Sequence, residues 1–166
     1  MKKIFFIVLG IAFSFTSCEK DDICDANTPT TPQVVIEFYD ISNPETLKNV
    51  TDLSIIGIDG NGTLSFTDVS KIMLPLKTMS DLTQYQFVIN SSDDTLKNED
   101  LLDFNYSRKN EYISRACGFK TLFYLDAANP ILLTDAPTSD GIWIQNITIT
   151  NSNIINEIET HVKIYF

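Results

Sequence analysis

Short stretches in which apolar and polar side chains alternate, separated by turn-forming residues, run through most of this sequence of 166 residues. In residues 158–166, for example, the even positions are mostly apolar and the odd positions are mostly polar. A period of two residues is that of a half-buried strand. We therefore expect strands at 33–40, 53–58, 63–67, 71–77, 84–90, 101–107, 111–117, 119–125, 141–150 and 158–166.

Turn signals organise these strands into pairs. The run Asp59-Gly60-Asn61-Gly62 is typical of a tight turn that needs positive φ, and residues 108–110 are expected to turn a hairpin between 101–107 and 111–117. Only 44–50 and 153–157 suggest helix, for one or two turns each. Many short strands without a long helix predict one all-β domain, a two-sheet antiparallel β-sandwich, with an immunoglobulin-like strand order as first choice.

The N-terminus has the three parts of an export signal. Lys2 and Lys3 are followed by an apolar run at 4–13, and small residues then precede Cys18. The run is short for a membrane-spanning helix, which needs about 20 apolar residues. We expect a lipoprotein signal peptide at 1–17, lipidation at Cys18, a lipidated tether at 18–32 and the sandwich domain at 33–166. An ordinary signal peptide cut elsewhere, or an uncleaved anchor, is the alternative.

The charge of the chain excludes one class of partner. The formal net charge is −10, and removal of Lys2 and Lys3 with the signal would change it to −12. Nucleic-acid binding needs clustered Lys and Arg, so we expect no nucleic-acid partner. The membrane would instead be reached through acyl chains on Cys18.

Three cysteines become two once Cys18 carries lipid. Cys24 and Cys117 are then an even pair in an oxidising compartment, which favours a disulfide. Two buried free thiols are the alternative.

Two stretches of the sequence resemble known proteins. The run Cys18-Glu19-Lys20-Asp21-Asp22 resembles the surface-export signal of Bacteroidetes lipoproteins. Together with Ile23-Cys24, the Pro-rich run at 28–32 and Ser114-Arg115-Ala116-Cys117-Gly118-Phe119-Lys120, it resembles an uncharacterised family of Bacteroidetes lipoproteins, a domain of unknown function. The resemblance implies an outer-membrane lipoprotein, lipid-anchored and surface-exposed, with an outer-membrane protein as the expected partner.

Catalytic and metal-binding patterns are poor. The single histidine, His161, falls on the expected solvent face of the last strand, so we expect a surface residue there. Zinc sites need several His or Cys ligands. A calcium loop beginning at Asp59 would need Glu at its twelfth position, where Ser70 stands. Acidic pairs such as Asp93-Asp94 are expected to be solvated charges. The sequence predicts no enzyme, no cofactor and no metal site.

Two further residues carry specific expectations. Trp143, the only tryptophan, lies in a stretch that is apolar on both faces, so we expect it in the core. The triplet Asp94-Thr95-Leu96 resembles a Bacteroidetes O-glycosylation signal, which makes Thr95 a candidate acceptor.

Arg115 is expected to be structural. Strand alternation places Arg115 on the same face as Cys117, so a partly buried guanidinium would need a carboxylate partner. A Cys24–Cys117 disulfide would bring Asp21, Asp22 and Asp25 within reach, and Arg115 would clamp the N-terminal segment to the domain. The alternative is an exposed Arg115 that binds a partner or an anion.

These observations lead to two expectations of function. The first is a non-enzymatic binding or accessory module of the cell envelope, associated with an outer-membrane protein. The second is a surface carbohydrate-binding or adhesion module, which would need an exposed aromatic patch.

Overall fold

The structure is a computed structural model that describes residues 23–58, 62–137 and 140–166. All regular elements within these ranges are strands. None of the described residues belongs to a helix that could cross a membrane.

The smaller sheet has five strands and is built around the first one. Its members are β1 (Val34–Asp40), β2 (Asn43–Leu47), β5 (Lys71–Leu74), β10 (Asn146–Ile149) and β12 (Val162–Tyr165). β1 pairs with β2 and β5 in antiparallel fashion. It pairs in parallel with β12, so that Ile36 lies beside Val162 and Phe38 beside Ile164.

The larger sheet has seven strands, all antiparallel to their neighbours. Its members are β3 (Leu53–Gly57), β4 (Thr63–Phe66), β6 (Leu82–Ile89), β7 (Asn98–Ser114), β8 (Gly118–Leu125), β9 (Ile131–Asp135) and β11 (Asn153–Ile154). Its main order is β11-β8-β7-β6-β3-β4, with β9 also paired to β7. Consecutive strands β6, β7 and β8 are neighbours, which makes this part a meander.

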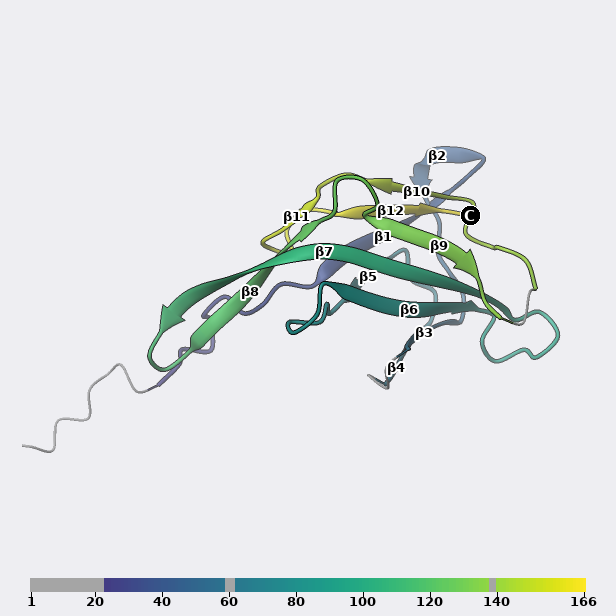
Figure 1. Ribbon diagram of the computed structural model, residues 1–166. Coiled ribbons are helices and arrows are strands. Elements are labelled where there is room, and N and C mark those ends of the chain that lie inside the picture. Colours follow the sequence, from purple (N-terminus) through teal and green to yellow (C-terminus); the bar gives the residue numbers. More distant parts are fainter. Residues whose placement is uncertain (1–22, 59–61, 138–139) are drawn as a thin grey trace, which may run out of the picture.

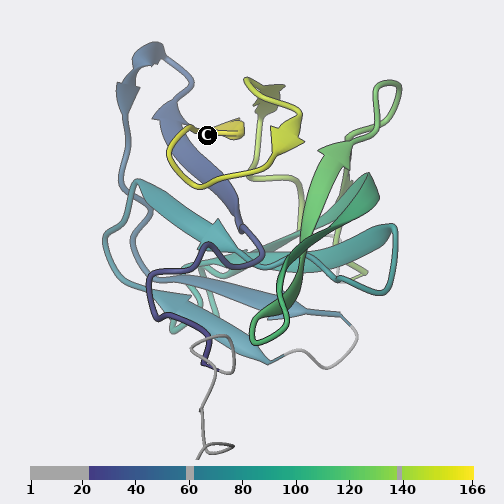
Figure 2. The ribbon, with the colours of Figure 1, turned by 90° about the vertical axis from the view of Figure 1, so that its left-hand side faces the viewer.

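The two sheets pack face to face, as the sequence predicts for a β-sandwich, and Figure 2 shows them as two layers. The core takes side chains from both sheets, including Phe38 and Ile164 from the smaller one and Phe87, Phe104 and Phe123 from the larger one. Burial of these apolar faces is the main stabilising contribution to the fold. The sheets hold five and seven strands, more than the four and three of a constant-type immunoglobulin domain.

The expected hairpin turn at 108–110 is wrong. Residues 98–114 form one strand of 17 residues, and the chain turns at 115–117 instead. The polar run Ser107-Arg108-Lys109-Asn110 is turn-like in composition. It continues as strand because each of these residues pairs with a residue of β8, from Tyr124 to Thr121.

Other strand boundaries also differ from the expectation. The helical signal at 44–50 corresponds to β2, and the one at 153–157 begins with β11. The expected strand at 141–150 is regular only over β10, and β9 was not expected at all. The described part of the expected turn after β3 includes Gly62, with a φ of 84°, which glycine adopts at no steric cost.

Candidate functional site

The longest strand extends beyond the sandwich. Pairing of β7 with β6 ends at Asn105, whereas its pairing with β8 runs from Tyr106 to Ser114. We call residues 107–120 the arm, and Figure 1 shows this hairpin projecting from the body of the domain. An isolated two-stranded hairpin is marginally stable in water, so the arm needs support from its own cross-strand pairs and from other segments.

Polar cross-strand contacts supply part of this support. Lys120 and Glu111 form an ion pair at 3.1 Å between Nζ and Oε1. At the base of the arm, the Arg108 guanidinium contacts the Asp81 carboxylate at 2.6 Å and also donates to the carbonyl of Thr78. The first contact joins the two strands of the arm. The contacts of Arg108 tie the base of the arm to the loop before β6.

The N-terminal segment supplies the rest. The predicted disulfide between Cys24 and Cys117 is confirmed, with the two Cα atoms 4.9 Å apart. Farther along, the Thr121 N–H donates to Thr31 Oγ1 at 3.0 Å. Residues 24–31 therefore lie along the arm, with a groove of about 260 Å³ between them.

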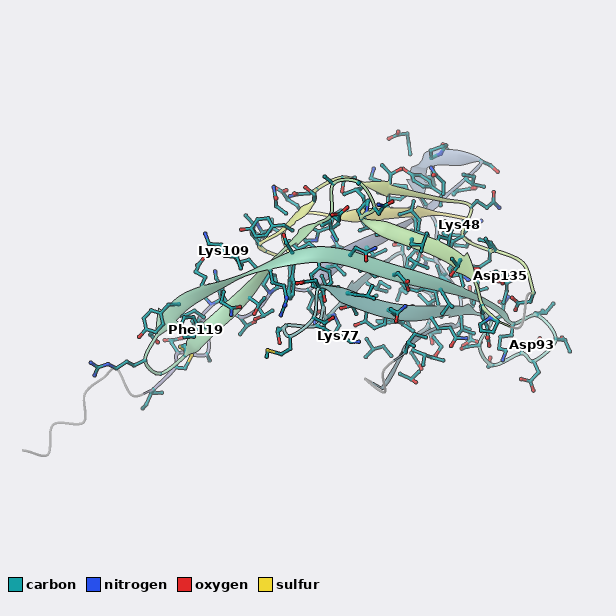
Figure 3. The ribbon with its side chains drawn as sticks, viewed as in Figure 1. Lys48, Lys77, Asp93, Lys109, Phe119 and Asp135 are labelled. Atoms are coloured by element: carbon teal, nitrogen blue, oxygen red, sulfur yellow. A yellow bond between two sulfur atoms is a disulfide. The ribbon has the colours of Figure 1, made fainter. Side chains whose placement is uncertain are left out.

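An exposed apolar patch lies at the end of the arm. The rings of Tyr112 and Phe119 meet edge to face with centroids 5.3 Å apart, although 56% of Tyr112 and 66% of Phe119 are exposed. Ile23 is 82% exposed and is the neighbour of Cys24, which binds Cys117. We call Tyr112 and Phe119 the tip patch; Figure 3 shows Phe119 near the far end of the arm.

The partial burial expected for Arg115 is wrong. Arg115 lies in the turn of the arm and is exposed, because the turn at 115–117 carries it out of the strand alternation. Among the described residues it makes no ion pair, Asp25 included. Asp21 and Asp22, the other expected partners of the clamp, lie outside the described residues, as does the expected lipidation site Cys18.

His161 is not the surface residue that the sequence predicts. Its exposed fraction is 1%, and its Nδ1 accepts the Val35 N–H at 2.9 Å. Its own backbone N–H donates to the Val35 carbonyl. Burial lowers the pKa of His161, and Glu159 and Glu157 oppose this only in part. The imidazole is therefore a neutral acceptor that joins the start of β1 to the residue before β12.

Trp143 packs against the core, as expected, but is only partly buried. Its indole N–H donates to the Phe87 carbonyl at 3.2 Å, and its ring meets Phe166 edge to face. The indole N–H is therefore used in a contact within the fold.

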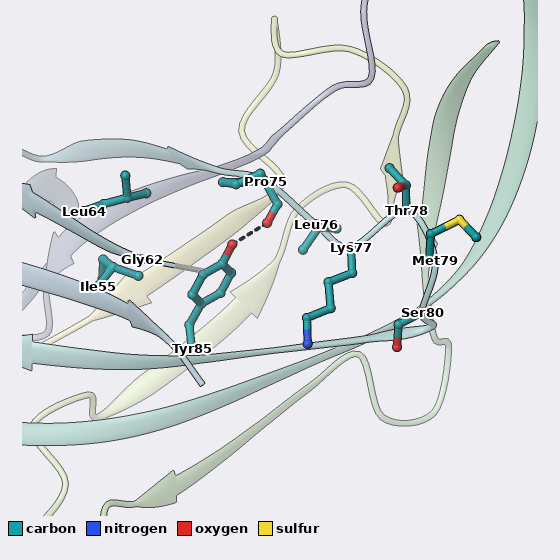
Figure 4. A pocket seen from close by; sticks show the side chains of 10 residues that line it. All are labelled: Ile55, Gly62, Leu64, Pro75, Leu76, Lys77, Thr78, Met79, Ser80 and Tyr85. Atoms are coloured by element: carbon teal, nitrogen blue, oxygen red, sulfur yellow. Dashed lines mark hydrogen bonds between the residues drawn. The ribbon is translucent and has the colours of Figure 1, made fainter. Parts of the chain in front are cut away.

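A shallow apolar groove lies beside the edge strand β4. Its volume is about 470 Å³, and its walls include Leu64, Pro75 and Met79, which is 90% exposed. The Tyr85 hydroxyl donates to the Pro75 carbonyl, as Figure 4 shows, and burial raises the pKa of Tyr85 to about 12. The one phenol here is thus held as a neutral donor, and the groove suits an apolar side chain better than a reaction.

A buried carboxylate lies on β7, at the end of the sandwich away from the arm. Asp100 is fully buried, and its Oδ2 accepts the backbone N–H groups of Trp143 and Ile144 at 3.0 and 2.8 Å. Burial raises the pKa of Asp100 to about 6, and Asp135 and Asp140 add to the shift. In the part of the chain that the structure describes, no group of three or more His, Cys, Asp and Glu side chains is arranged to hold a metal ion.

Two other predicted sites fall on loops. Thr95 is exposed, and its hydroxyl donates to Asp93 Oδ1 at 2.7 Å; its glycosylation stays a prediction. Asp59 and Asn61 of the calcium-like loop lie outside the described residues.

The tip patch and the Asp100 environment were both missed by sequence reasoning. The signal for the patch was present in the polar run before Tyr112, which was interpreted as a turn. Asp100 belongs to the acidic pair Glu99-Asp100, for which solvated charge in a loop was the expectation; its pairing with β9 decides its burial instead.

Comparison with known protein families gives a match. The model of a family of unknown function, DUF6452, matches residues 52–166, which is more than half of the chain. No curated protein and no solved structure matches the chain.

Proposed function

Because the chain belongs to the DUF6452 family, whose function is unknown, we propose its role from its geometry: a non-enzymatic binding or accessory module of the cell envelope that presents the tip patch to a partner. The observation that carries the proposal is the exposure of Tyr112 and Phe119 at the end of a disulfide-braced arm. Aromatic side chains are enriched in protein interfaces, where they supply large contact areas.

The use of the single histidine supports a role in binding. His161 is buried in a backbone contact, so it is removed from the acid–base chemistry for which histidine is most often used.

The proposed place is the outer membrane, with the domain held by lipid on Cys18. Only six steps along the chain lead from Cys18 to Cys24, which the disulfide fixes to the arm. At about 3.3–3.6 Å per residue, this tether spans at most roughly 20 Å. A lipidated chain would hold the tip patch near the membrane, where an outer-membrane protein is the expected partner.

A carbohydrate-binding or adhesion role is the second candidate, and the exposed Tyr112–Phe119 pair is the observation that favours it. The two rings are inclined at 65°. They therefore form an angled surface, and not the flat platform on which a sugar ring stacks best.

Site-specific photo-crosslinking in intact cells tests the proposal. A photoreactive residue at Phe119 should give a discrete crosslink to an outer-membrane protein. The matched control is Ile158, which is 87% exposed and belongs to the segment before β12. It should give none.

The same experiment on a Cys18→Ser background tests the anchor. The protein should leave the membrane fraction or accumulate as precursor, and the Phe119 crosslink should disappear. If the probe at Phe119 yields only uncrosslinked protein, or if the probe at Ile158 crosslinks equally well, the accessory role is contradicted. Normal maturation and membrane fractionation of the Cys18→Ser variant would contradict the lipid anchor.

A further inference from the structure

Three buried side-chain oxygens near the C-terminal end of β9 have no hydrogen-bond partner. They are Oδ1 of Asn98, Asp100 and Asp135, and they are the only such side-chain atoms in the described ranges 23–58, 62–137 and 140–166. Buried acceptors without donors cost free energy, and carboxylate oxygens cost more than neutral ones.

The strand register places these three side chains together. Asp100 on β7 is paired directly with Asp135 on β9. The neighbouring Ala136 N–H donates to the Glu99 carbonyl, which makes Glu99–Ala136 a hydrogen-bonded pair. Asp100–Asp135 is then of the other kind, in which opposite side chains lie closest. Asn98 is two residues before Asp100, on the same face of β7.

The segment from Asp140 to Ile144 crosses all three side chains. Its carbonyl at Asp140 accepts the Asn98 amide, and its Gly141 N–H donates to Asp135 Oδ2. Its Trp143 and Ile144 N–H groups donate to Asp100 Oδ2. One polar atom of each side chain is thus hydrogen-bonded to this segment, and Oδ1 of each side chain has no donor.

Two carboxylates that face each other with buried oxygens repel each other unless a positive charge lies between them. In the described residues, no Lys or Arg forms an ion pair with Asp100 or Asp135. A water molecule would not resolve the arrangement, since it donates only two hydrogen bonds and carries no charge. A hard cation bound between the two carboxylates would supply the missing positive charge and a partner for their leftover oxygens.

We propose that Asn98, Asp100 and Asp135 form a calcium-binding site at this end of the sandwich. Two carboxylates and one amide oxygen are the ligand types that Ca²⁺ takes, and its flexible coordination accommodates added waters or carbonyls. With only two carboxylates the set falls short of a site built from three acidic, His or Cys ligands. An affinity in the range of about 10⁻⁴ to 10⁻³ M, as in extracellular calcium modules, follows from so few charged ligands. Figure 3 places Asp135 far from Phe119, so the site is separate from the tip patch.

Thermal unfolding with added calcium chloride at pH 8 tests the site. Calcium at ten to one hundred times its Kd should raise the melting temperature of the folded chain by roughly 3–10 °C. Asp100→Asn and Asp135→Asn should each abolish most of this rise, because each removes a charged ligand and keeps an acceptor for the backbone donors. Asp103→Asn is the matched control: it makes the same charge change on the opposite face of β7, where Asp103 accepts from Gln84, and it should keep the full rise.

Terbium luminescence gives a second readout that does not depend on stability. Trp143, the only tryptophan, donates its backbone N–H to Asp100 and should sensitise Tb³⁺ bound at the site. Calcium should displace the signal, and both Asn variants should lose it. Absence of a calcium-induced rise in the intact protein, or an equal rise in both Asn variants, would overturn the proposal.

Discussion

At the scale of single residues, His161 shows how a titratable group can become part of the backbone hydrogen bonding. Its Nδ1 replaces a carbonyl as the acceptor for the Val35 N–H, one residue before the β1–β12 pairing begins. Protonation would turn this acceptor into a donor that faces another donor. The contact therefore exists only with neutral imidazole.

The stability of the protein should depend on pH through this group. Because the pKa of His161 is lowered from 6.5 in the folded state, the unfolded chain binds the proton more tightly. The contribution of His161 is complete above pH 6.5 and is lost as the pH falls toward the folded pKa, by up to about 1.4 kcal/mol per pH unit. Urea unfolding of the wild type and of His161→Gln between pH 5 and 8 should show the free-energy difference between them shrinking on acidification. A constant difference would contradict the neutral role, because other titrating groups cancel in the comparison.

The two arginines should differ in their effect on stability. Arg115 is exposed and without an ion pair among the described residues, so Arg115→Ala should change the free energy of unfolding by less than about 0.5 kcal/mol. Arg108→Ala removes the contacts with Asp81 and Thr78 and should cost roughly 0.5–1 kcal/mol. Denaturant unfolding of both variants measures this. A larger loss for Arg115→Ala than for Arg108→Ala would restore the structural clamp.

At the scale of elements, the sequence predicted most strands and the Cys24–Cys117 pairing, because alternation and cysteine parity are local or countable signals. It did not predict that β7 runs through 108–110, since the composition there favours a turn and only pairing with β8 overrides it. A contact between residues distant in sequence also explains the error at His161. Alternation put its side chain on the solvent face, but the chain before β12 is irregular and turns it toward Val35.

The disulfide should stabilise the arm more than it stabilises the sandwich core. It closes 93 residues of chain, for which the chain-entropy model gives about 4–5 kcal/mol, with measured values commonly about 2–4. The double variant Cys24→Ser/Cys117→Ser should lose free energy of unfolding within this range. Its amides at 107–120 should exchange hydrogen much faster, while those of β1 and β6 change only with global stability.

Thr31→Val provides the control for the disulfide. It removes the bond to the Thr121 N–H and keeps the covalent link, so it should cost about 1 kcal/mol. Unchanged exchange of the arm in the double-serine variant would show that the cross-strand pairs alone hold it.

At the scale of the whole molecule, the arm, the disulfide and the tip patch lie at one end, and Asp135 lies near the other. The sequence predicted the braced N-terminal segment, since both cysteines and the short spacing from Cys18 are visible in it. The three leftover oxygens at the opposite end were beyond prediction. They depend on which residues of β7 and β9 face each other and on where residues 140–144 cross them.

The parallel pairing of β1 with β12 has a consequence for how the chain acquires its structure. Val162 lies beside Ile36 across 126 positions of sequence, and β12 separates β1 from β10. The smaller sheet therefore cannot be completed until residue 165 has been synthesised. Contacts this distant in sequence also slow folding. During translation, β1 would pair first with β2 and β5, and β10 would join the smaller sheet only after β12 has formed beside β1.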